Sequence, residues 1–259
     1  ELGGQVRDGR LVCRQSIHVA RSQDPAEDGE QRLFSRGHFA CRARDDGTIQ
    51  GKRRLKRLII IGAGGHGAVV AEAAAASGKW SEIDFLDDAP DHETVVGFPV
   101  AGGLAKLDQC LDESCDFVVA VGDNGRRLEL IETIRDKGGS LAVVVHPMTS
   151  ISPSAVISPG AVICAGAIVN ARASLGTASI VNTGATVDHD CDIADGVHIS
   201  PGANLAGNVT IGEQSWIGIG ASVRDGTRIG RNVTAGAGAA IVSDVPDGAT
   251  VTGVPAWTQ

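Results

Sequence analysis

Residues 151–245 repeat a pattern of six. Every sixth residue from Ile151 to Ile229 is Ile, Val or Leu, and Ala235 and Ile241 continue the series. Four positions after each of these residues comes a small or compact side chain. Sixteen hexads match without a slip, so chance does not explain them. A period of six is neither helical nor simple strand alternation, and it is typical of a parallel β-helix in which each hexad is one short strand and a turn.

Three hexads are expected to form one triangular coil, so residues 18 positions apart should stack on one another. The aliphatic positions then point inward and make one continuous core column, and the hexads make about five coils. Gly, Asn and Asp recur where the corners are expected, because these residues tolerate a positive φ. The sequence therefore predicts an all-β solenoid for residues 149–259, which ends in a carboxyl-terminal tail.

Composition narrows the function classes. The 259 residues carry a net charge of −8, which argues against a nucleic-acid partner. No apolar run is long enough to span a membrane and no signal peptide is visible, so we expect a cytoplasmic protein without a membrane partner. The six cysteines show neither metal-ligand spacing nor a dense disulfide framework, so no metal is expected.

Residues 1–55 differ from the rest of the chain. They are rich in Arg and poor in aliphatic residues, and they sustain no hydrophobic period. We expect a disordered or non-native extension. A basic tail that binds a partner is the alternative.

Residues 56–148 alternate strands and helices. Strands are expected at 58–61, 83–86, 117–121 and 141–145, helices at 68–76 and 126–137, and a connecting segment at 97–100. This alternation predicts a small parallel α/β sheet of Rossmann type with about four strands.

A glycine-rich loop follows the first of these strands. Gly62, Gly64 and Gly67 match the dinucleotide fingerprint between a strand and a helix, and Asp87 follows about twenty residues later. Such a loop places a phosphate at a helix amino terminus. Alone it would indicate a nicotinamide cofactor, but so short a unit fits a mononucleotide or the diphosphate of a nucleotide sugar better. A purely structural turn is the alternative, and His66 within the loop could hydrogen-bond a phosphate or a sugar.

Histidine is the main candidate for chemistry in the solenoid. His189 takes the third place of its hexad and should project outward, between the stacking neighbours Ala171 and Gly207. Both neighbours are small, which leaves room around the imidazole, and Asp190 beside it could fix the tautomer. His198 is expected to stack below Trp216. A functional role is one reading of His198, and a structural hydrogen bond at a corner is the alternative. Two histidines are too few for a catalytic zinc site.

The chain resembles a known family. Its specific segments are residues 62–67, 85–88, 181–183, 189–191 and 253–256. With the α/β unit followed by hexads, they resemble the bacterial sugar acetyltransferases of the NeuD/PglD type, which acetylate nucleotide-activated amino sugars or sialic acid. The resemblance covers about residues 56–257.

Several expectations follow from this resemblance. The β-helix would be left-handed, and the protein a homotrimer with active sites between neighbouring solenoids. His189 matches the general base and Asp190 the acid beside it. Acetyl-CoA would lie near His198, Gly207, Ile219 and Gly253. The nucleotide end of the sugar substrate would lie in the α/β domain, at Gly64, Gly65, His66, Asp87, Asp88 and Gly122. Trp257 stands where the family usually has a basic residue.

The resulting hypothesis is acetyl-CoA-dependent acetylation of a nucleotide-activated amino sugar, or of a sialic acid-like sugar, by direct transfer with His189 as the base. A non-catalytic binding or scaffold protein is the first alternative. A nicotinamide-dependent oxidoreductase and a metal-dependent lyase are weaker ones. The nucleotide, the sugar and the acetylated atom stay open.

Overall fold

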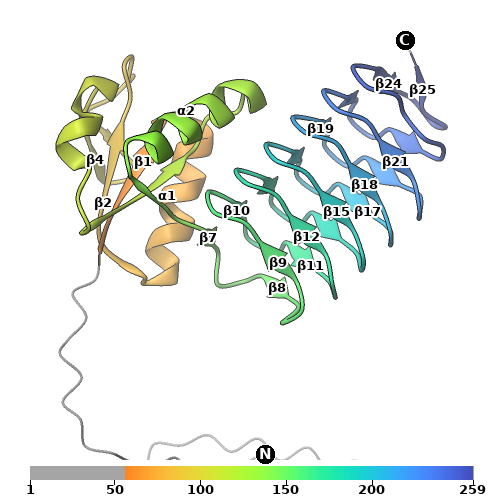
Figure 1. The fold of residues 1–259 in the computed structure, drawn as a ribbon, viewed down its shortest axis with the longest axis horizontal. Coiled ribbons are helices and arrows are strands. Elements are labelled where there is room, and N and C mark those ends of the chain that lie inside the picture. The colour runs from red at the N-terminus through yellow and green to blue at the C-terminus, as the bar shows by residue number, and fades with distance from the viewer. Residues whose placement is uncertain (1–55, 259) are drawn as a thin grey trace, which may run out of the picture. The chain divides into compact units, whose positions relative to one another are not determined.

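A computed structural model describes residues 56–258 of the chain. The extension expected at residues 1–55 therefore lies outside the described residues. The described chain forms an α/β domain that leads directly into a solenoid (Figure 1).

The α/β domain is a six-stranded sheet with two α-helices. The sheet order is β3-β4-β2-β1-β5-β6, with all neighbours parallel except β3 and β4. The strands are β1 (Lys56–Ile61), β2 (Trp80–Leu86), β3 (Thr94–Val95), β4 (Phe98–Gly102), β5 (Cys115–Val119) and β6 (Ser140–Leu141). The helices are α1 (Gly65–Ser77), the 3-10 helix η1 (Leu104–Cys110) and α2 (Asn124–Asp136). This arrangement confirms the Rossmann-like fold.

Three expectations for this domain need correction. The sheet has six strands rather than about four, because 98–102 pairs with β2 as a strand instead of only connecting, and 94–95 pairs with 98–99 as a further strand. The expected strand at 141–145 is two strands: β6 closes the α/β sheet, whereas β7 (Val144–Val145) pairs with the solenoid. Helix α1 begins at Gly65, three residues before the expected start.

The solenoid has three faces, and each face is a sheet of short strands that pair in parallel between successive coils. The first face contains β7, β10 (Val162–Ile163), β13 (Ile180–Val181), β16 (His198–Ile199), β19 (Trp216–Ile217), β22 (Thr234–Ala235), β24 (Thr250–Thr252) and the antiparallel β25 (Trp257–Thr258). The second face contains β8 (Ser150–Ile151), β11 (Ile168–Val169), β14 (Thr186–Val187), β17 (Asn204–Leu205), β20 (Ser222–Val223) and β23 (Ala240–Ile241). The third face contains β9 (Val156–Ile157), β12 (Ser174–Leu175), β15 (Asp192–Ile193), β18 (Thr210–Ile211) and β21 (Arg228–Ile229).

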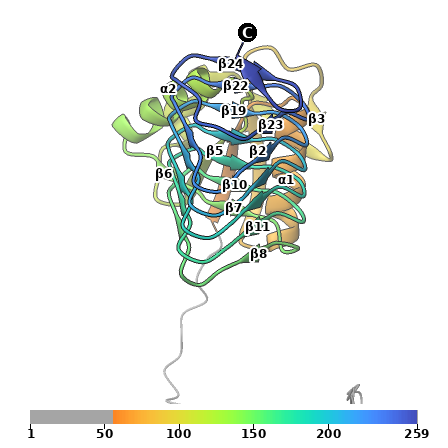
Figure 2. The same cartoon turned by 90° about the vertical axis from the view of Figure 1, so that its right-hand side faces the viewer.

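The hexads predict this solenoid correctly. Each aliphatic position of the repeat is the second residue of a two-residue strand, and strands pair with partners 18 residues away, as Val181 does with Ile199. These side chains form one continuous buried core. The result is a left-handed parallel β-helix, whose coils are seen from the carboxyl-terminal end in Figure 2.

The α/β domain packs against the first coils of the first face. On that face, Val162 and Ile180 point outward, yet both are fully buried because they share a core cluster with Val70 and other residues of α1. The next outward residues of the same column, His198 and Trp216, lie where the domain ends. The first face therefore changes from a domain contact to an accessible surface within one column of side chains.

Candidate functional site

His189 lies at the edge where the chain passes from the second face to the third. Its side chain is 49% exposed, so it projects outward as expected. Gly207 is directly beside the ring: a Cβ at that position would lie 2.5 Å from Cε1 of His189. The absence of a side chain at 207 is therefore what lets the imidazole lie where it does.

Asp190 holds the ring from one side. His189 Nδ1 is 2.7 Å from Asp190 Oδ2, which favours the tautomer with the proton on Nδ1 and leaves Nε2 free to accept a proton. The backbone N–H of His189 also donates to Asp188 Oδ1 at 2.7 Å. Both the ring and its backbone are thus fixed by neighbouring carboxylates.

Arg172 is a further member of this group that the sequence analysis missed. Its guanidinium donates to both oxygens of Asp190, with Nε 2.6 Å from Oδ1 and one terminal nitrogen 2.7 Å from Oδ2. Arg172, followed by His189, lowers the pKa of Asp190 to about 2, so Asp190 is a carboxylate throughout the physiological range. The 18-residue stack could have revealed Arg172, because 172 and 190 are one coil apart.

The glycine loop combines structural and open positions. A Cβ at Gly67 would lie 2.1 Å from the carbonyl oxygen of Gly62, so close packing of α1 on β1 requires glycine there. Gly64 and Gly65 instead face open space, with nothing within 4 Å of an added Cβ. The helix amino terminus is therefore accessible to a phosphate at these two residues.

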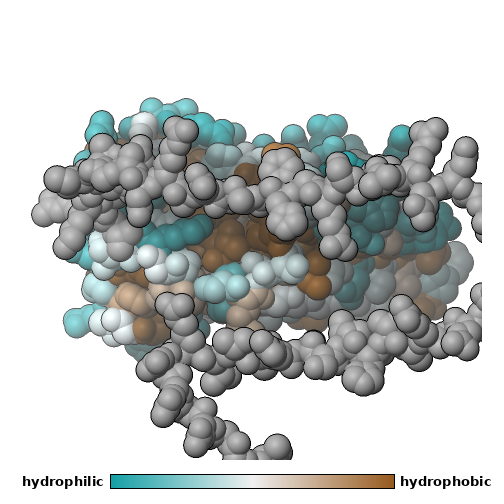
Figure 3. Space-filling view, turned by 90° about the horizontal axis from the view of Figure 1, so that it is seen from below, coloured by the Kyte–Doolittle hydropathy of each residue, from teal (hydrophilic) through white to brown (hydrophobic). Residues whose placement is uncertain are grey.

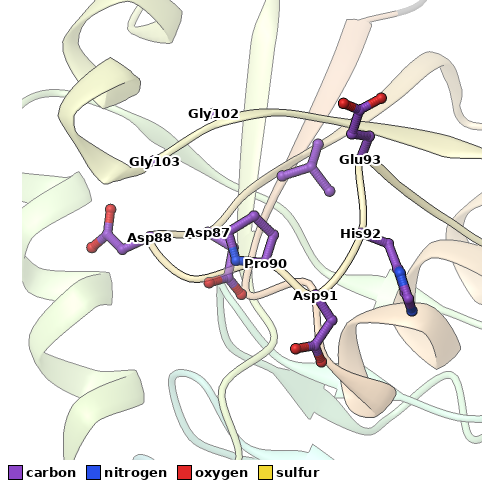
Figure 4. A pocket seen from close by; sticks show the side chains of 9 residues that line it. Asp87, Asp88, Pro90, Asp91, His92, Glu93, Gly102 and Gly103 are labelled. Atoms are coloured by element: carbon purple, nitrogen blue, oxygen red, sulfur yellow. The ribbon is translucent and has the colours of Figure 1, made fainter.

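Asp87 and Asp88 line a pocket of about 360 Å³ after β2 (Figure 4). Asp87 Oδ2 accepts from the backbone N–H of Ala63 at 2.7 Å, so it ties this pocket to the glycine loop. Asp88 Oδ1 accepts from the N–H of Leu104 at 2.7 Å. Each carboxylate keeps accepting capacity, so the pocket suits hydroxyl or imide donors.

His66 and His198 meet across the two domains. Their ring centroids are 6.3 Å apart, and His198 stacks on Trp216 at 5.9 Å with an interplanar angle of 6°. The stacking of His198 and Trp216 was predicted, but the approach of His66 was not. Asn182 Nδ2 lies 3.0 Å from Nε2 of His198. Burial, with a contribution from the cation of Arg127, lowers the pKa of His66 to about 4 and that of His198 to about 3, so both rings are neutral at pH 7.

A cavity of about 610 Å³ opens beside this stack. One wall is residues 122–125 of the α/β domain, and the other comes from His198, Trp216 and the next coils. Gly122 of the predicted nucleotide site therefore lies on the same cavity as His198.

The structure brings some predicted residues together and separates others. Gly64, Gly65, His66, Asp87, Asp88 and Gly122 all lie at the carboxyl-terminal side of the α/β sheet strands or in the loops that follow them. The four residues predicted for acetyl-CoA are apart within one chain. His198 is on the first face, Gly207 at the edge between the second and third faces, Ile219 at the edge between the first and second, and Gly253 after the last coil.

Two features are absent from the described residues. Among residues 56–258, no group of three or more His, Cys, Asp or Glu side chains could hold a metal ion. None of the helices in this range has the length and apolar character needed to cross a membrane.

The chain matches known proteins along the described region. The family model of the PglD N-terminal domain matches residues 57–134. The acetyltransferase domain of PglB from Neisseria gonorrhoeae FA1090 is 52% identical over 79% of this chain and 100% of its own, with a TM-score of 0.77. A second structure of that domain is a complex with acetyl coenzyme A.

PerB from Caulobacter crescentus, in complex with CoA and GDP-perosamine, is 37% identical over 79% of this chain and 98% of its own, with a TM-score of 0.74. A variant of it is described as a GDP-perosamine N-acetyl transferase. These matches favour an enzyme over the scaffold and oxidoreductase alternatives. The chain belongs to the NeuD/PglD-type family of sugar acetyltransferases and is an acetyltransferase.

Proposed function

We propose that the protein transfers an acetyl group from acetyl-CoA to the amine of a nucleotide-activated sugar, with His189 as the general base. Relatives bind acetyl coenzyme A, or CoA with GDP-perosamine, which supports both substrate classes. The observation that carries the proposal is the outward imidazole of His189, held by Asp190 and cleared by Gly207.

The reaction is a direct transfer. Nε2 of His189 takes a proton from the sugar amine as its nitrogen attacks the thioester carbonyl. A carbon–nitrogen bond forms, the carbon–sulfur bond breaks, and the proton passes from His189 to the departing thiolate of CoA. Asp190 stays ionised and stabilises the imidazolium that forms transiently.

A covalent acyl-enzyme is not needed. Cys191 is the cysteine next to this group, but it is 1% exposed and its Sγ points to the carbonyl of Ala206 at 3.2 Å. Burial also raises its pKa, which lowers the thiolate fraction. A buried protonated thiol is a poor nucleophile.

The acceptor's nucleotide is assigned to the pocket of Asp87 and Asp88 and to the open glycines Gly64 and Gly65. Its diphosphate would lie at the amino terminus of α1. The sugar would then extend toward the cavity between Gly122 and the stacked His198. We assign His198 to the acceptor side, beside His66, whereas the family resemblance predicts it near acetyl-CoA.

Completing this site takes a second chain. His189 lies on the edge between the second and third faces, whereas the α/β domain of the same chain covers the first face and the edge next to it. Gly207 and Ile219 lie on different edges, so one acetyl-CoA groove that contains both also requires two solenoids. We therefore assign active sites between neighbours of a homotrimer. Exposed apolar side chains along the solenoid, such as Val156 at 61%, and apolar areas on the underside of the molecule (Figure 3) fit such contacts.

The test is a transfer assay with acetyl-CoA and a panel of nucleotide amino sugars. Replacing His189 by Ala should lower the rate by roughly 10²–10⁴, as expected for loss of a general base. His146→Ala is the matched control, since His146 lies at the start of the solenoid, where its Nδ1 accepts a hydrogen bond from the backbone N–H of Met148 at 3.0 Å. Near-wild-type turnover of His189→Ala would overturn the assignment.

A further inference from the structure

Arg127 of α2 is a buried cation whose hydrogen bonds within residues 56–258 all go to neutral groups. The residue is 0% exposed. Its Nε donates to the carbonyl of Ala178 at 2.9 Å, and its terminal nitrogens donate to backbone carbonyls and one amide oxygen: Val121 (2.9 Å), Gly122 (3.3 Å), Gly196 (2.8 Å) and Oδ1 of Asn124 (2.7 Å). Burying a charge without an ion-pair partner is costly, so its retention calls for a reason.

The acceptors belong to both domains. Val121 and Gly122 lie between β5 and α2 and Asn124 is the first residue of α2, whereas Ala178 and Gly196 are corners of two successive solenoid coils. Burial lowers the pKa of Arg127 to about 10, so it stays cationic at neutral pH and can donate all these bonds at once. A single guanidinium thus joins the α/β domain to two coils.

Helix α2 runs along one edge of the solenoid, and two of its turns, from Ile131 to Asn124, contact four successive corners. Positions 160, 178, 196 and 214 stack at intervals of one coil along this edge. Ile131 packs at Gly160, where an added Cβ would lie 2.9 Å from its Cδ1. Arg127 bonds the next two corners, and Asn124 Nδ2 donates to the carbonyl of Gln214 at 2.9 Å.

The rise per turn of helix α2 is nearly equal to the spacing between successive solenoid coils. An α-helix advances about 5.4 Å per turn, and paired strands lie about 4.8 Å apart. A helix laid along the edge would therefore find similar apolar contacts after a shift of one turn, which moves it by about one coil. The forked guanidinium, bonded to specific carbonyls on both sides, fixes one alignment.

This alignment determines the cavity of the acceptor side. Residues 122–125, one wall of the cavity, are held directly by Arg127 and Asn124. The other wall contains His198, two residues after the carbonyl of Gly196 that Arg127 also bonds. We propose that Arg127 is a positioning residue for acetyl transfer, which fixes α2 on the solenoid and thereby the width of the cavity that receives the acceptor sugar. The proposal rests on the proposed function for the identity of the acceptor.

The test compares two variants. Arg127→Met keeps an unbranched side chain but cannot donate hydrogen bonds. Arg127→Lys keeps the positive charge but lacks the forked guanidinium. Arg127→Met should raise KM for the nucleotide sugar at least about tenfold and leave KM for acetyl-CoA unchanged, and Arg127→Lys should restore part of the loss. Ile83→Ala is the matched control, because Ile83 is buried on β2 in a core cluster that contains no residue of α2. An equal KM increase in Ile83→Ala at an equal loss of Tm would overturn the proposal, as would an unchanged KM in Arg127→Met.

Hydrogen exchange tests the positioning role independently of turnover. In Arg127→Met, amides of 121–127 and of the solenoid corners at 176–179 and 194–198 should exchange faster together, whereas Ile83→Ala should leave the exchange of these amides unchanged. Faster exchange confined to α2 would contradict the role of Arg127 as a link between domains. If the wild-type protein transferred no acetyl group, the proposed function would fail while this measurement still decided the role of Arg127.

Discussion

Replacing Gly207 by Ala should lower the rate of acetyl transfer strongly and leave the free energy of unfolding nearly unchanged. The new Cβ would lie 2.5 Å from Cε1 and 2.7 Å from Nε2 of His189. Carbon atoms in contact need about 3.5 Å, so the ring must move by roughly 1 Å. Because the clash is with the outer part of an exposed side chain, the ring can rotate away without disturbing the core.

The expected loss follows from this displacement. A misplacement of about 1 Å in a catalytic group costs roughly 10² in rate, which corresponds to about 2.7 kcal/mol of transition-state stabilisation. The free energy of unfolding should change by less than about 1 kcal/mol, since Gly→Ala at a position outside the positive-φ region slightly favours the folded state.

Steady-state kinetics and thermal unfolding measure the two effects separately. The control is a double-mutant cycle: in the His189→Ala background, Gly207→Ala should have little further effect, because the ring that it displaces is already absent. Wild-type kcat/KM in Gly207→Ala, or an equal loss with and without His189, would refute the reasoning.

Two further predictions concern the charged groups around the site. Arg172→Ala should lower kcat/KM about tenfold, because Asp190 loses the bidentate partner that orients it toward His189, while Tm should hardly change since exposed ion pairs contribute little. Arg172→Lys should recover part of the activity, and unchanged kinetics in Arg172→Ala would contradict the role. Stability should fall below pH 6.5, because His66 and His198 have pKa values of about 4 and 3 in the folded protein and the unfolded chain therefore binds more protons in this window. Between pH 7 and pH 5 the loss should be roughly 2 kcal/mol for each histidine, measured by urea unfolding. His198→Gln should reduce this dependence, and equal stability of the wild type at both pH values would refute it.

The solenoid could be predicted almost residue by residue, and the α/β domain less well. Hexads specify strand, corner and stacking partner at once, so the position of Gly207 beside His189 followed from counting in steps of 18, whereas Arg172 beside Asp190 was missed. Residues 98–102 and the break between β6 and β7 were missed, because short strands at sheet edges depend on pairing partners rather than on local pattern. The periodicity of 141–145 carries no sign that the chain changes sheets there.

Contacts between domains could not be predicted from the repeat. His66 and His198 approach each other because α1 packs on the first face, which no local motif encodes. Arg127 lies in an ordinary helical sequence, and its burial becomes evident only when α2 is placed along the solenoid edge. The positive φ of Arg172, Ala178 and Gln214 likewise departs from the expectation of Gly, Asn and Asp at the corners, since the turn of the coil imposes that conformation on whichever residue stands there.

The central claim is that this solenoid transfers acetyl groups to nucleotide amino sugars through His189. The most direct test is to incubate the protein with acetyl-CoA and UDP-, GDP- and CMP-linked amino sugars, and to detect the added acetyl group by mass spectrometry. The proposal predicts a product with one acetyl group from at least one nucleotide sugar, formed roughly 10²–10⁴ times more slowly by His189→Ala than by His146→Ala. Equal product formation by the two variants, or no acetylated product from any of these sugars, would contradict it.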